Sequence, residues 1–591
     1  MKTLTIKIKK NTPMKAFRIL TLVTLMTNAA ASLHAQNNDV EANDPHPASA
    51  EVWQNVEKAS LGWGSTDVRY GKGDVPRLEN NIMLNAWRGE RVSAQAVLVT
   101  PKNIDRLTIE MSDLKNGSNV IPSKDIRKYF VRYVLTDSYL AKNGESQHGA
   151  HLTEAFDSFL VADRLQPAGE MRVEARTVRP LWIDIRVPQD AAPGRYKGMM
   201  TVRTDGEELA LPLTLVVSNR TLPLPSQWKF HLDLWQNPYS VADFYGVPLW
   251  SKEHFDLMRP IMTELANAGQ KVITCSVIRH PWNSQTHVPF ESMIGKTRRL
   301  DGSWSYDYKV FDKWVGFMMD CGITEQIDCY TILPWHSTFE YFDEQTNFSR
   351  EVRLDPQSAE YEEYLLPFLS DFARHLKQKG WFGKTCIAMD ERPKAQLEAA
   401  YKVLYKADKD YRVEGAVNYF APEMAERMYD VSFEYAHPAL EKDLLDSHLG
   451  RGGKVTFYTC CGPVRPNTFT FSPPAESAYL GWHAAAMGYS GYLRWAYNSW
   501  VANQLTDSRF RTWPAGDCFL VYPGGSSIRM ERLVEGIQAY EKIQILRSEL
   551  KGKKLEALEN ELKRFAPVNM EESVNAADEV NHARQVLLRL E

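Results

Sequence analysis

Cysteine is scarce and unevenly placed in this sequence of 591 residues. The seven cysteines all lie beyond residue 274, and an odd number does not suit a disulfide framework. Several stand in apolar runs, where a free thiol packs like a small hydrophobic side chain: Cys275, Cys329, Cys386 and Cys460. There is no CxxC or HExxH motif, and His280, His287 and His336 lack the spacing of metal ligands. We therefore expect no metal site and no cofactor, and cysteines that pack rather than react.

Acidic residues are missing from the first 35 residues, which contain six lysines or arginines. An apolar run, Ile19–Met26, follows the basic residues, and small residues at Ala29-Ala30-Ala31 come before position 35. This order predicts a secretory signal peptide over residues 1–35 and a secreted or periplasmic protein. The apolar run is short for a membrane span and no later segment reaches spanning length, so we expect no span in the mature chain.

The mature chain also lacks an excess of positive charge. Without the signal peptide it has 64 lysines and arginines against 74 acids, a formal net charge of −10. A nucleic-acid-binding protein needs a basic face, so this balance argues against a nucleic-acid partner. The hydrophobic content of 44% and the 16 tryptophans indicate a globular protein, and its length requires more than one domain.

Helical patterns are missing from the first part of the mature chain. A polar, flexible leader is expected over residues 36–51, and residues 52–217 contain short alternating runs separated by turn-forming residues. The predicted strands are Arg91–Thr100, Leu107–Leu114, Lys128–Leu135, Leu181–Pro188, Tyr196–Arg203 and Leu209–Val217. Several short strands without helices predict an antiparallel β-sandwich. It contains no cluster of acids or nucleophiles, so we expect it to support the rest of the protein.

A proline-containing linker over residues 218–227 leads to a different pattern, in which strands alternate with helices over residues 228–550. Eight strands are predicted: Phe230–Leu234, Val272–Ile278, Gln326–Ile332, Thr385–Met389, Val413–Val417, Val431–Tyr435, Val455–Tyr458 and Gly491–Ala496. This alternation predicts a (β/α)8, or TIM, barrel. The whole chain is therefore expected to be a multidomain α/β protein, with an N-terminal β-sandwich followed by a C-terminal barrel.

Two helical features complete the prediction. The clearest helix should begin at Asp355-Pro356, a good N-cap followed by proline, and end at Gly380. Residues 551–591 should form a helical extension with two amphipathic helices, Lys553–Phe565 and Asp578–Leu590.

The predicted chemistry is concentrated in KTCIAMDERP, residues 384–393. Its apolar part, Thr385–Met389, predicts a strand buried on both faces, and Asp390 and Glu391 follow it directly. Barrels carry their active sites at the carboxyl ends of the strands, so we predict that these acids are catalytic. The alternative is an ordinary helix N-terminus, where acids are also favoured.

Aromatic residues follow nearly every predicted barrel strand. Flat rings beside histidine, asparagine and arginine donors suit a neutral polyhydroxylated ligand, that is, a sugar. A single aromatic residue is more often part of the packing, but the repetition at strand ends favours a carbohydrate partner. From position alone we select these substrate-binding residues: Trp335, His336, Tyr458, Trp495 and Asn498.

A sugar site beside two acids predicts a glycoside hydrolase, but the acids are not placed as the usual retaining mechanism requires. That mechanism uses an acid and a separate carboxylate nucleophile about 5–5.5 Å apart. Here the fourth strand carries both acids, the seventh ends in cysteines, and Glu434 in the sixth is the nearest spare acid. Adjacent acids suit a substrate-assisted mechanism, in which the 2-acetamido group of the sugar is the nucleophile.

Four motifs carry a resemblance: MDERP at 389–393, GYSGYLRWAYNSW at 488–500, LVYPGG at 520–525 and SSIRMERLVEGIQAYE at 526–541. Together they resemble glycoside hydrolase family 123. The resemblance implies a β-sandwich followed by a barrel, and an exo-acting, retaining β-N-acetylgalactosaminidase. It also implies that Asp390 stabilises the acetamido group and that Glu391 is the acid/base. One departure is Gln538-Ala539-Tyr540, where we would expect an acid before the tyrosine; we expect this position on a helix surface.

Two other interpretations stay open. A β-N-acetylglucosaminidase would use the same mechanism on a sugar that differs only in the orientation of its 4-hydroxyl, and the residues do not separate the two. A non-catalytic sugar-binding protein could share the fold, but it would not need an intact acid pair.

Overall fold

The computed structural model of the chain describes residues 40–137, 158–282, 285–418, 422–437, 439–510, 512–568 and 570–591. The expected signal peptide, residues 1–35, and the first part of the leader lie outside the described residues. Residues Ala42–Glu591 form one compact unit. None of the helices in the described ranges combines the length and apolar composition that a membrane span needs.

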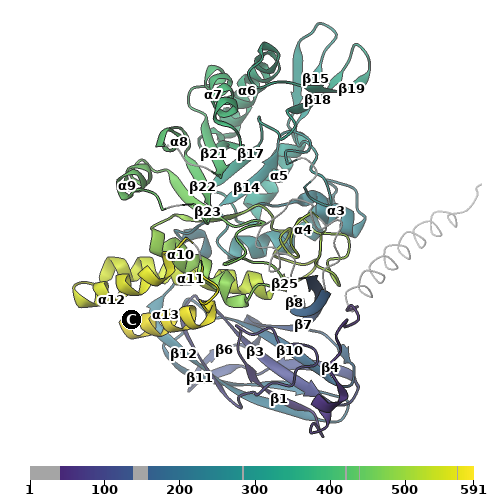
Figure 1. Cartoon of the computed structure of the whole chain (residues 1–591), viewed down its shortest axis with the longest axis vertical. Helices are drawn as coiled ribbons and strands as arrows, with labels where there is room; N and C mark the ends of the chain where they lie inside the picture. Colours follow the sequence, from purple (N-terminus) through teal and green to yellow (C-terminus); the bar gives the residue numbers. More distant parts are fainter. Residues whose placement is uncertain are drawn as a thin grey trace, which may run out of the picture. The chain divides into compact units, whose positions relative to one another are not determined.

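Two β-sheets form the N-terminal part, which confirms the predicted β-sandwich (Figure 1). In spatial order the first sheet contains β1 (Ser60–Gly64), β3 (Arg91–Thr100), β10 (Thr177–Arg186), β7 (Ile126–Asp137), β8 (Ser158–Pro167) and β25 (Ser526–Ser527). The second contains β2 (Ile82–Arg88), β12 (Glu208–Thr221), β11 (Gly194–Arg203), β4 (Ile104–Met111) and β9 (Met171–Val173), with β5 (Leu114–Asn116) and β6 (Asn119–Ile121) alongside. The described strand pairs are antiparallel except β2 and β12, which run parallel.

Strand β3 shows how the sandwich is held together. Successive side chains of a strand point to opposite faces of the sheet. Ala96 and Leu98 pack in the core between the two sheets, whereas Val97 and Val99 pack with Trp53 on the other face. The first half of β3 alternates polar and apolar residues, whereas residues 96–99 are covered on both faces and are apolar without alternation.

Eight parallel strands form a barrel in the C-terminal part, as the alternating pattern predicts. Around the barrel they are β13 (His231–Leu234), β14 (Val272–Ser276), β17 (Gln326–Tyr330), β20 (Thr385–Met389), β21 (Arg412–Val417), β22 (Asp430–Glu434), β23 (Lys454–Tyr458) and β24 (Gly491–Arg494). Strand β24 pairs with β13, and Lys271 N donates to Leu232 O over 3.0 Å where β13 meets β14. The carboxyl ends of all eight strands therefore lie on one rim.

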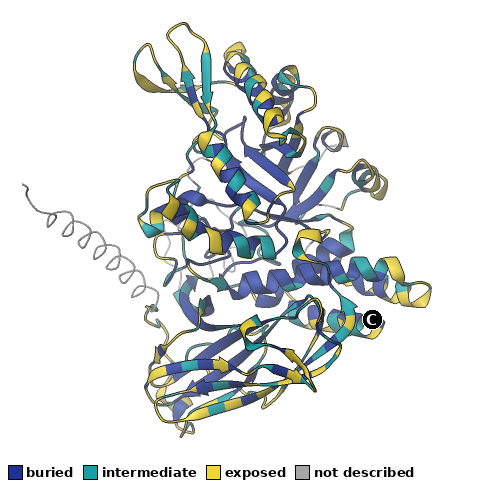
Figure 2. Ribbon diagram, turned by 180° about the vertical axis from the view of Figure 1, so that it is seen from behind, coloured by how far each residue is buried: buried dark blue, intermediate teal, exposed yellow. Residues whose placement is uncertain are grey.

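Helices cover the outside of the barrel strands, which are buried (Figure 2). The helices of the C-terminal part are α3 (Pro238–Tyr245), α4 (Lys252–Asn267), α5 (Lys309–Asp320), α6 (Ala359–Lys379), α7 (Lys394–Ala407), α8 (Pro422–Arg427), α9 (Lys442–Gly450), α10 (Pro474–Met487), α11 (Ile528–Glu549), α12 (Lys553–Leu562) and α13 (Ala576–Leu590). Short 3-10 helices are η1 (Ala50–Trp53), η2 (Ser123–Asp125), η4 (Pro225–Gln227), η5 (Phe382–Lys384) and η6 (Lys563–Phe565). The two predicted C-terminal helices are confirmed as α12 with η6, and α13.

Helix α6 begins later than predicted. Ser358, not Asp355, is the N-cap, since Ser358 Oγ accepts a hydrogen bond from Tyr361 N over 3.2 Å. Asp355 instead stabilises the preceding turn by accepting from Gln357 N over 2.9 Å. The predicted end is confirmed, because Gly380 has the left-handed conformation of a helix C-cap, with φ 71°.

A small sheet extends from the rim of the barrel. It contains β15 (Gly295–Arg298), β16 (Trp304–Asp307), β18 (Thr338–Asp343) and β19 (Phe348–Arg353), which follow β14 and β17 in the chain (Figure 1). The segment between β17 and β18 carries Trp335 and His336, so this excursion also positions predicted site residues.

Helix α11 connects the barrel to the sandwich. The preceding β25 extends the first sandwich sheet by pairing with β8. Gln538 of α11 accepts a hydrogen bond from Arg91 N and donates one to Arg91 O, both over 2.8 Å. The expectation that residues 538–540 lie on a helix surface is therefore wrong: Gln538 is 1% exposed and Tyr540 is 6% exposed. The face of α11 that carries Gln538 packs against the sandwich, and a helical pattern in the sequence does not show that a second domain covers that face.

Candidate active site

The acid pair lies just beyond β20, and its two side chains contact different partners. Asp390 Oδ2 accepts a hydrogen bond from Trp335 Nε1 over 2.6 Å. Glu391 Oε1 accepts from the Tyr458 hydroxyl over 2.5 Å, and Glu391 Oε2 accepts from Asn418 Nδ2 over 3.0 Å. The donors come from the segments after β17 and β21 and from the end of β23, so the barrel rim orients both acids.

The residues that follow the acids fix this arrangement. Pro393 is the N-cap of α7, so the chain turns away from the rim directly after the pair. Arg392 Nε donates to Leu333 O over 3.1 Å, and the Arg392 guanidinium lies 4.3 Å from the ring centroid of Trp335. Arg392 thereby supports the indole that donates to Asp390.

Burial raises the pKa of both acids, and different neighbours modify the rise. Burial and, next, the negative charge of Asp390 together raise the pKa of Glu391 to about 6, against the opposing effect of the Tyr458 hydrogen bond. Burial also raises the pKa of Asp390, but the Trp335 N–H, the Glu391 backbone N–H and the Arg392 charge favour its ionised form. Two carboxyls this close resist ionising together, so the pair retains a proton in mildly acidic solution.

The pair lines a cavity of about 220 Å³ at the barrel rim. Its wall is rich in aromatic side chains: Trp235, Trp282, Trp335, Tyr458, Trp495 and Trp513. Trp235 and Trp282 stack with ring centroids 4.9 Å apart, and Trp282 Nε1 has no acceptor among the described residues. Flat apolar rings with a few convergent polar groups suit a carbohydrate.

The cavity contains three of the five residues selected for substrate binding: Trp335, Tyr458 and Trp495. His336 lies outside it and lines a separate cavity with Arg279 and Glu340. Asn498 is fully buried and not part of the cavity wall: its side chain accepts from Asn237 N and donates to Asn237 O, both over 2.9 Å. Position after a strand is therefore not sufficient, because it does not tell which way a side chain points.

Asn418 and Asp517 are among the polar residues of the cavity that were not selected from the sequence. Asn418 directly follows β21, where the rule that selected the other strand-end residues would have found it. Asp517 lies in a long segment after β24, and no spacing rule connects it to the strand.

Sequence profiles of a known family match most of the chain. The profile of the glycoside hydrolase 123 catalytic domain matches residues 235–546, and that of the glycoside hydrolase 123 N-terminal domain matches residues 63–204. The chain belongs to glycoside hydrolase family 123. The resemblance of the motifs is thus confirmed, and the family makes this protein a glycosidase with a carbohydrate substrate.

A solved structure from family 123 has the same architecture. The enzyme from Clostridium perfringens, studied for glycolipid glycan hydrolysis, is 26% identical with a TM-score of 0.81, over 90% of this chain and 98% of that chain. A GH10 xylanase from termite gut with a bacterial Ig-like domain is 12% identical with a TM-score of 0.29, over 61% of this chain and 90% of that chain. No curated protein matches this chain.

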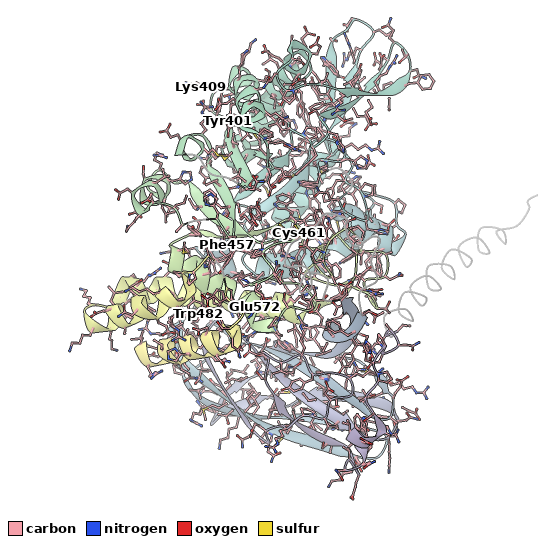
Figure 3. All side chains as sticks on the ribbon, in the orientation of Figure 1. Tyr401, Lys409, Phe457, Cys461, Trp482 and Glu572 are labelled. Carbon is pink, nitrogen blue, oxygen red and sulfur yellow. The ribbon has the colours of Figure 1, made fainter. Side chains whose placement is uncertain are left out.

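Five of the seven cysteines of this family 123 chain lie in barrel strands or in the cavity wall, and Cys321 and Cys518 are buried elsewhere. Cys275, Cys329 and Cys386 are buried in barrel strands, where they pack as predicted. Cys460 and Cys461 also line the cavity, with their sulfur atoms 3.7 Å apart (Figure 3 labels Cys461). Their mutual hydrogen bond and burial raise the pKa of Cys460, so its thiol stays protonated and is a poor nucleophile.

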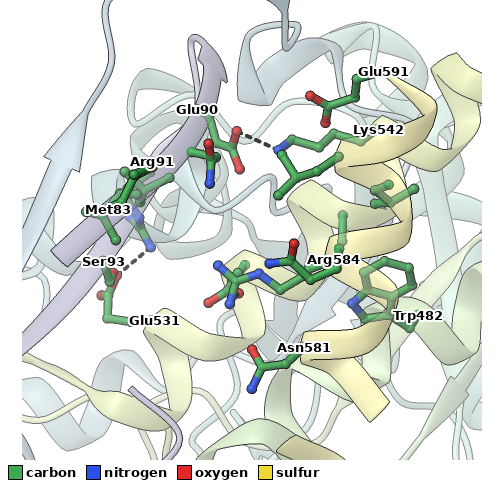
Figure 4. A pocket seen from close by; sticks show the side chains of 18 residues that line it. Met83, Glu90, Arg91, Ser93, Trp482, Glu531, Lys542, Asn581, Arg584 and Glu591 are labelled. Atoms are coloured by element: carbon green, nitrogen blue, oxygen red, sulfur yellow. Dashed lines mark ion pairs between the residues drawn. The ribbon is translucent and has the colours of Figure 1, made fainter. Parts of the chain in front are cut away.

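A second cavity, of about 240 Å³, lies between the sandwich strands β2 and β3 and the helices α11 and α13 (Figure 4). Its charged side chains pair with one another: Arg91 with Glu531 over 2.8 Å, and Lys542 with Glu90 over 2.7 Å (Figure 4). Paired charges stabilise the contact between the two parts, so we assign the chemistry of this glycosidase to the cavity at the barrel rim.

Proposed function

We propose that this protein is an exo-acting, retaining β-N-acetylgalactosaminidase that uses substrate-assisted catalysis. The observation that carries the proposal is the adjacent pair Asp390 and Glu391, which share a cavity but have different donors. The resemblance of the motifs supports the choice of sugar. The natural substrate would be a glycan with a terminal β-linked N-acetylgalactosamine, and the work on glycolipid glycans with the Clostridium perfringens relative suggests such a chain.

In the first step the acetamido oxygen of the sugar attacks C1 while the glycosidic bond breaks. Glu391, protonated because of its raised pKa, gives its proton to the departing oxygen. Asp390, held as a carboxylate by Trp335, accepts the acetamido N–H and balances the positive charge of the oxazolinium ring.

In the second step water attacks C1 and the ring opens. The Glu391 carboxylate removes a proton from this water and returns to its starting state, while Asp390 continues to hold the acetamido group. Two displacements at C1 leave the product in the β-configuration. We also propose that the enzyme acts outside the cytoplasm, on the basis of the N-terminal sequence.

The wall of the cavity contains two further carboxyl groups, Glu434 and Asp517, and either would be the nucleophile in a conventional double displacement. A panel of aryl β-glycosides tests the choice. We expect hydrolysis of the N-acetylgalactosaminide, β-anomeric product in the first turnovers by NMR, and no turnover of the galactoside, which lacks the attacking oxygen. A sugar trapped covalently on Glu434 or Asp517, or an inverted product, would contradict the mechanism; faster hydrolysis of the N-acetylglucosaminide would contradict the specificity.

A further inference from the structure

Asp517 is a buried carboxylate in the wall of the active-site cavity, and the mechanism above does not use it. The residue is 0% exposed. Its Oδ1 accepts hydrogen bonds from Arg494 Nη2 over 2.7 Å and from Trp495 Nε1 over 3.3 Å. Its Oδ2 has no donor among the described residues. A buried carboxylate oxygen without a donor is costly, and in a cavity wall a ligand can supply the missing donor.

The surroundings of Asp517 fix it before a substrate arrives. Arg494 is fully buried and also donates to Asn467 Oδ1 over 3.0 Å. The preceding Gly516 has φ +80°, and a Cβ there would lie 2.8 Å from Thr470 N. Gly516 O also accepts from Arg529 Nη1 over 2.9 Å. These contacts fix the orientation of the carboxylate, so Oδ2 can accept a hydrogen bond from one direction only. This suits recognition of a single hydroxyl.

Asp517 is anchored at β24, on the side of the barrel opposite β20, the strand that the acid pair follows. Asp517 is bound to Arg494, the last residue of β24, whereas the acids follow β20. In the ring of eight strands, three strands separate β20 from β24 in either direction. In a pyranose ring C4 lies opposite C1. A sugar with C1 at Glu391 and its acetamido group at Asp390 therefore directs C4 toward Asp517.

We propose that Asp517 Oδ2 accepts a hydrogen bond from the 4-hydroxyl of the terminal sugar and thereby selects the axial orientation found in N-acetylgalactosamine. Asp517 is then the specificity-determining residue of this site. This assignment rests on the proposed hexosaminidase function. The equatorial 4-hydroxyl of N-acetylglucosamine would point away from Oδ2 and leave the buried oxygen without a donor.

Kinetics with three aryl β-glycosides test the assignment: the N-acetylgalactosaminide, its 4-deoxy analogue and its 6-deoxy analogue. In the wild type, loss of the 4-hydroxyl should lower kcat/KM roughly 10- to 100-fold, as expected for a hydrogen bond to a charged group, and loss of the 6-hydroxyl much less. In Asp517→Asn, which keeps the size of the side chain beside Arg494, the penalty for the 4-deoxy analogue should fall several-fold. Glu434→Gln is the matched control: it removes another cavity carboxyl and should keep the wild-type penalty.

The outcomes separate the two levels of the proposal. If the wild type hydrolyses none of the three glycosides, the hexosaminidase function is wrong. If it hydrolyses the parent compound but tolerates loss of the 4-hydroxyl, the assignment of Asp517 is overturned without any variant. The assignment also fails if Asp517→Asn slows the parent and the 4-deoxy analogue equally, because a merely structural effect would do that.

Discussion

At the scale of single residues, Asp390 and Glu391 show how two consecutive acids acquire different chemistry. Burial raises the pKa of both acids; an indole N–H and a nearby guanidinium oppose the rise at Asp390, whereas the neighbouring negative charge adds to it at Glu391. We expect Glu391→Gln to lower kcat roughly 10²–10⁴-fold for substrates with poor leaving groups. An activated aryl glycoside should lose much less, because its leaving group needs no proton.

The leaving-group series should be compared with Glu398→Gln. Glu398 lies on α7 close to the acids in sequence, but its carboxyl forms an exposed ion pair with Arg427. This control should leave both kinds of substrate unaffected. Equal losses for good and poor leaving groups in Glu391→Gln would remove Glu391 as the acid.

Two neighbours should shift the pKa of Glu391 in opposite directions. The Tyr458 hydroxyl stabilises the ionised form, so Tyr458→Phe should raise that pKa; the Glu434 charge disfavours it, so Glu434→Gln should lower it. In the proposed mechanism activity requires protonated Glu391 and therefore falls as pH rises through its pKa, which is about 6 in the wild type. In the plot of kcat/KM against pH, the basic limb should therefore shift to higher pH in Tyr458→Phe and to lower pH in Glu434→Gln. Shifts of the same sign would show that another group controls the limb.

The sequence predicted the position of the acid pair at the barrel rim because its signal is local: an apolar strand, two acids and a proline. It predicted the aromatic wall in part, since Trp335, Tyr458 and Trp495 lie where strand-end position places them. It failed for Asn498 and for Asp517, whose roles depend on contacts with Asn237 and Arg494 that are distant in the chain. Contacts between residues this far apart in the chain leave no signal in the spacing of residues or in the composition.

At the scale of elements, the barrel strands carry an unexpected group of buried acids. Asp233, Asp328, Glu414 and Asp430 come from four different strands and are each at most 3% exposed. Asp430 contacts His231 Nε2 over 2.8 Å. Burial opposes the ionised form of Asp430, but the contacts with His231 and Gln326 outweigh burial and lower the pKa of Asp430. Burial raises the pKa of Glu414, and the charges of Asp328 and Asp430 add to the rise.

Glu414→Gln should therefore become progressively more stable than the wild type as pH rises. The folded-state pKa of Glu414 exceeds the unfolded value of about 4.3, so its stabilising contribution is complete below that pH and decreases above it. Each such group costs the wild type up to about 1.4 kcal/mol per pH unit until its folded pKa is passed. Asp430→Asn is the opposite case: its lowered pKa stabilises the fold above about pH 4, so this variant should be less stable at neutral pH. Urea unfolding at pH 5 and pH 8 measures both differences.

The strands and most helices followed from sequence because their patterns are local and repeated. The late start of α6 was not predicted. Asp355-Pro356 and Ser358 both suit the start of a helix, and in the folded protein the helix begins after Ser358. The burial of Gln538 was not predicted either, since a helix that packs against two domains has no single apolar face.

At the scale of the whole molecule, Arg529 ties the barrel to the sandwich. It is fully buried, its Nε contacts Asp163 Oδ2 of β8 over 3.0 Å, and its Nη1 donates to three backbone carbonyls. We expect Arg529→Met to cost about 3–5 kcal/mol, since it leaves a buried carboxylate short of a partner. Arg106→Ala, which removes the exposed pair with Glu170, should cost less than about 1 kcal/mol.

Denaturant unfolding followed by tryptophan fluorescence and by circular dichroism should give one coincident transition; separate transitions would show that the two parts are independent.

The pairing of β25 with β8 has a consequence for synthesis on the ribosome. The sandwich emerges first, yet the last strand of its first sheet and one of the two arginines that pair with Asp163 belong to a segment made much later, with Arg529 following Asp163 by 366 residues. Until then the nascent sandwich has an open strand edge, the kind of surface at which unfinished chains associate with each other. Holdase chaperones should therefore bind translation intermediates that stop before residue 526 and release those that extend beyond α11.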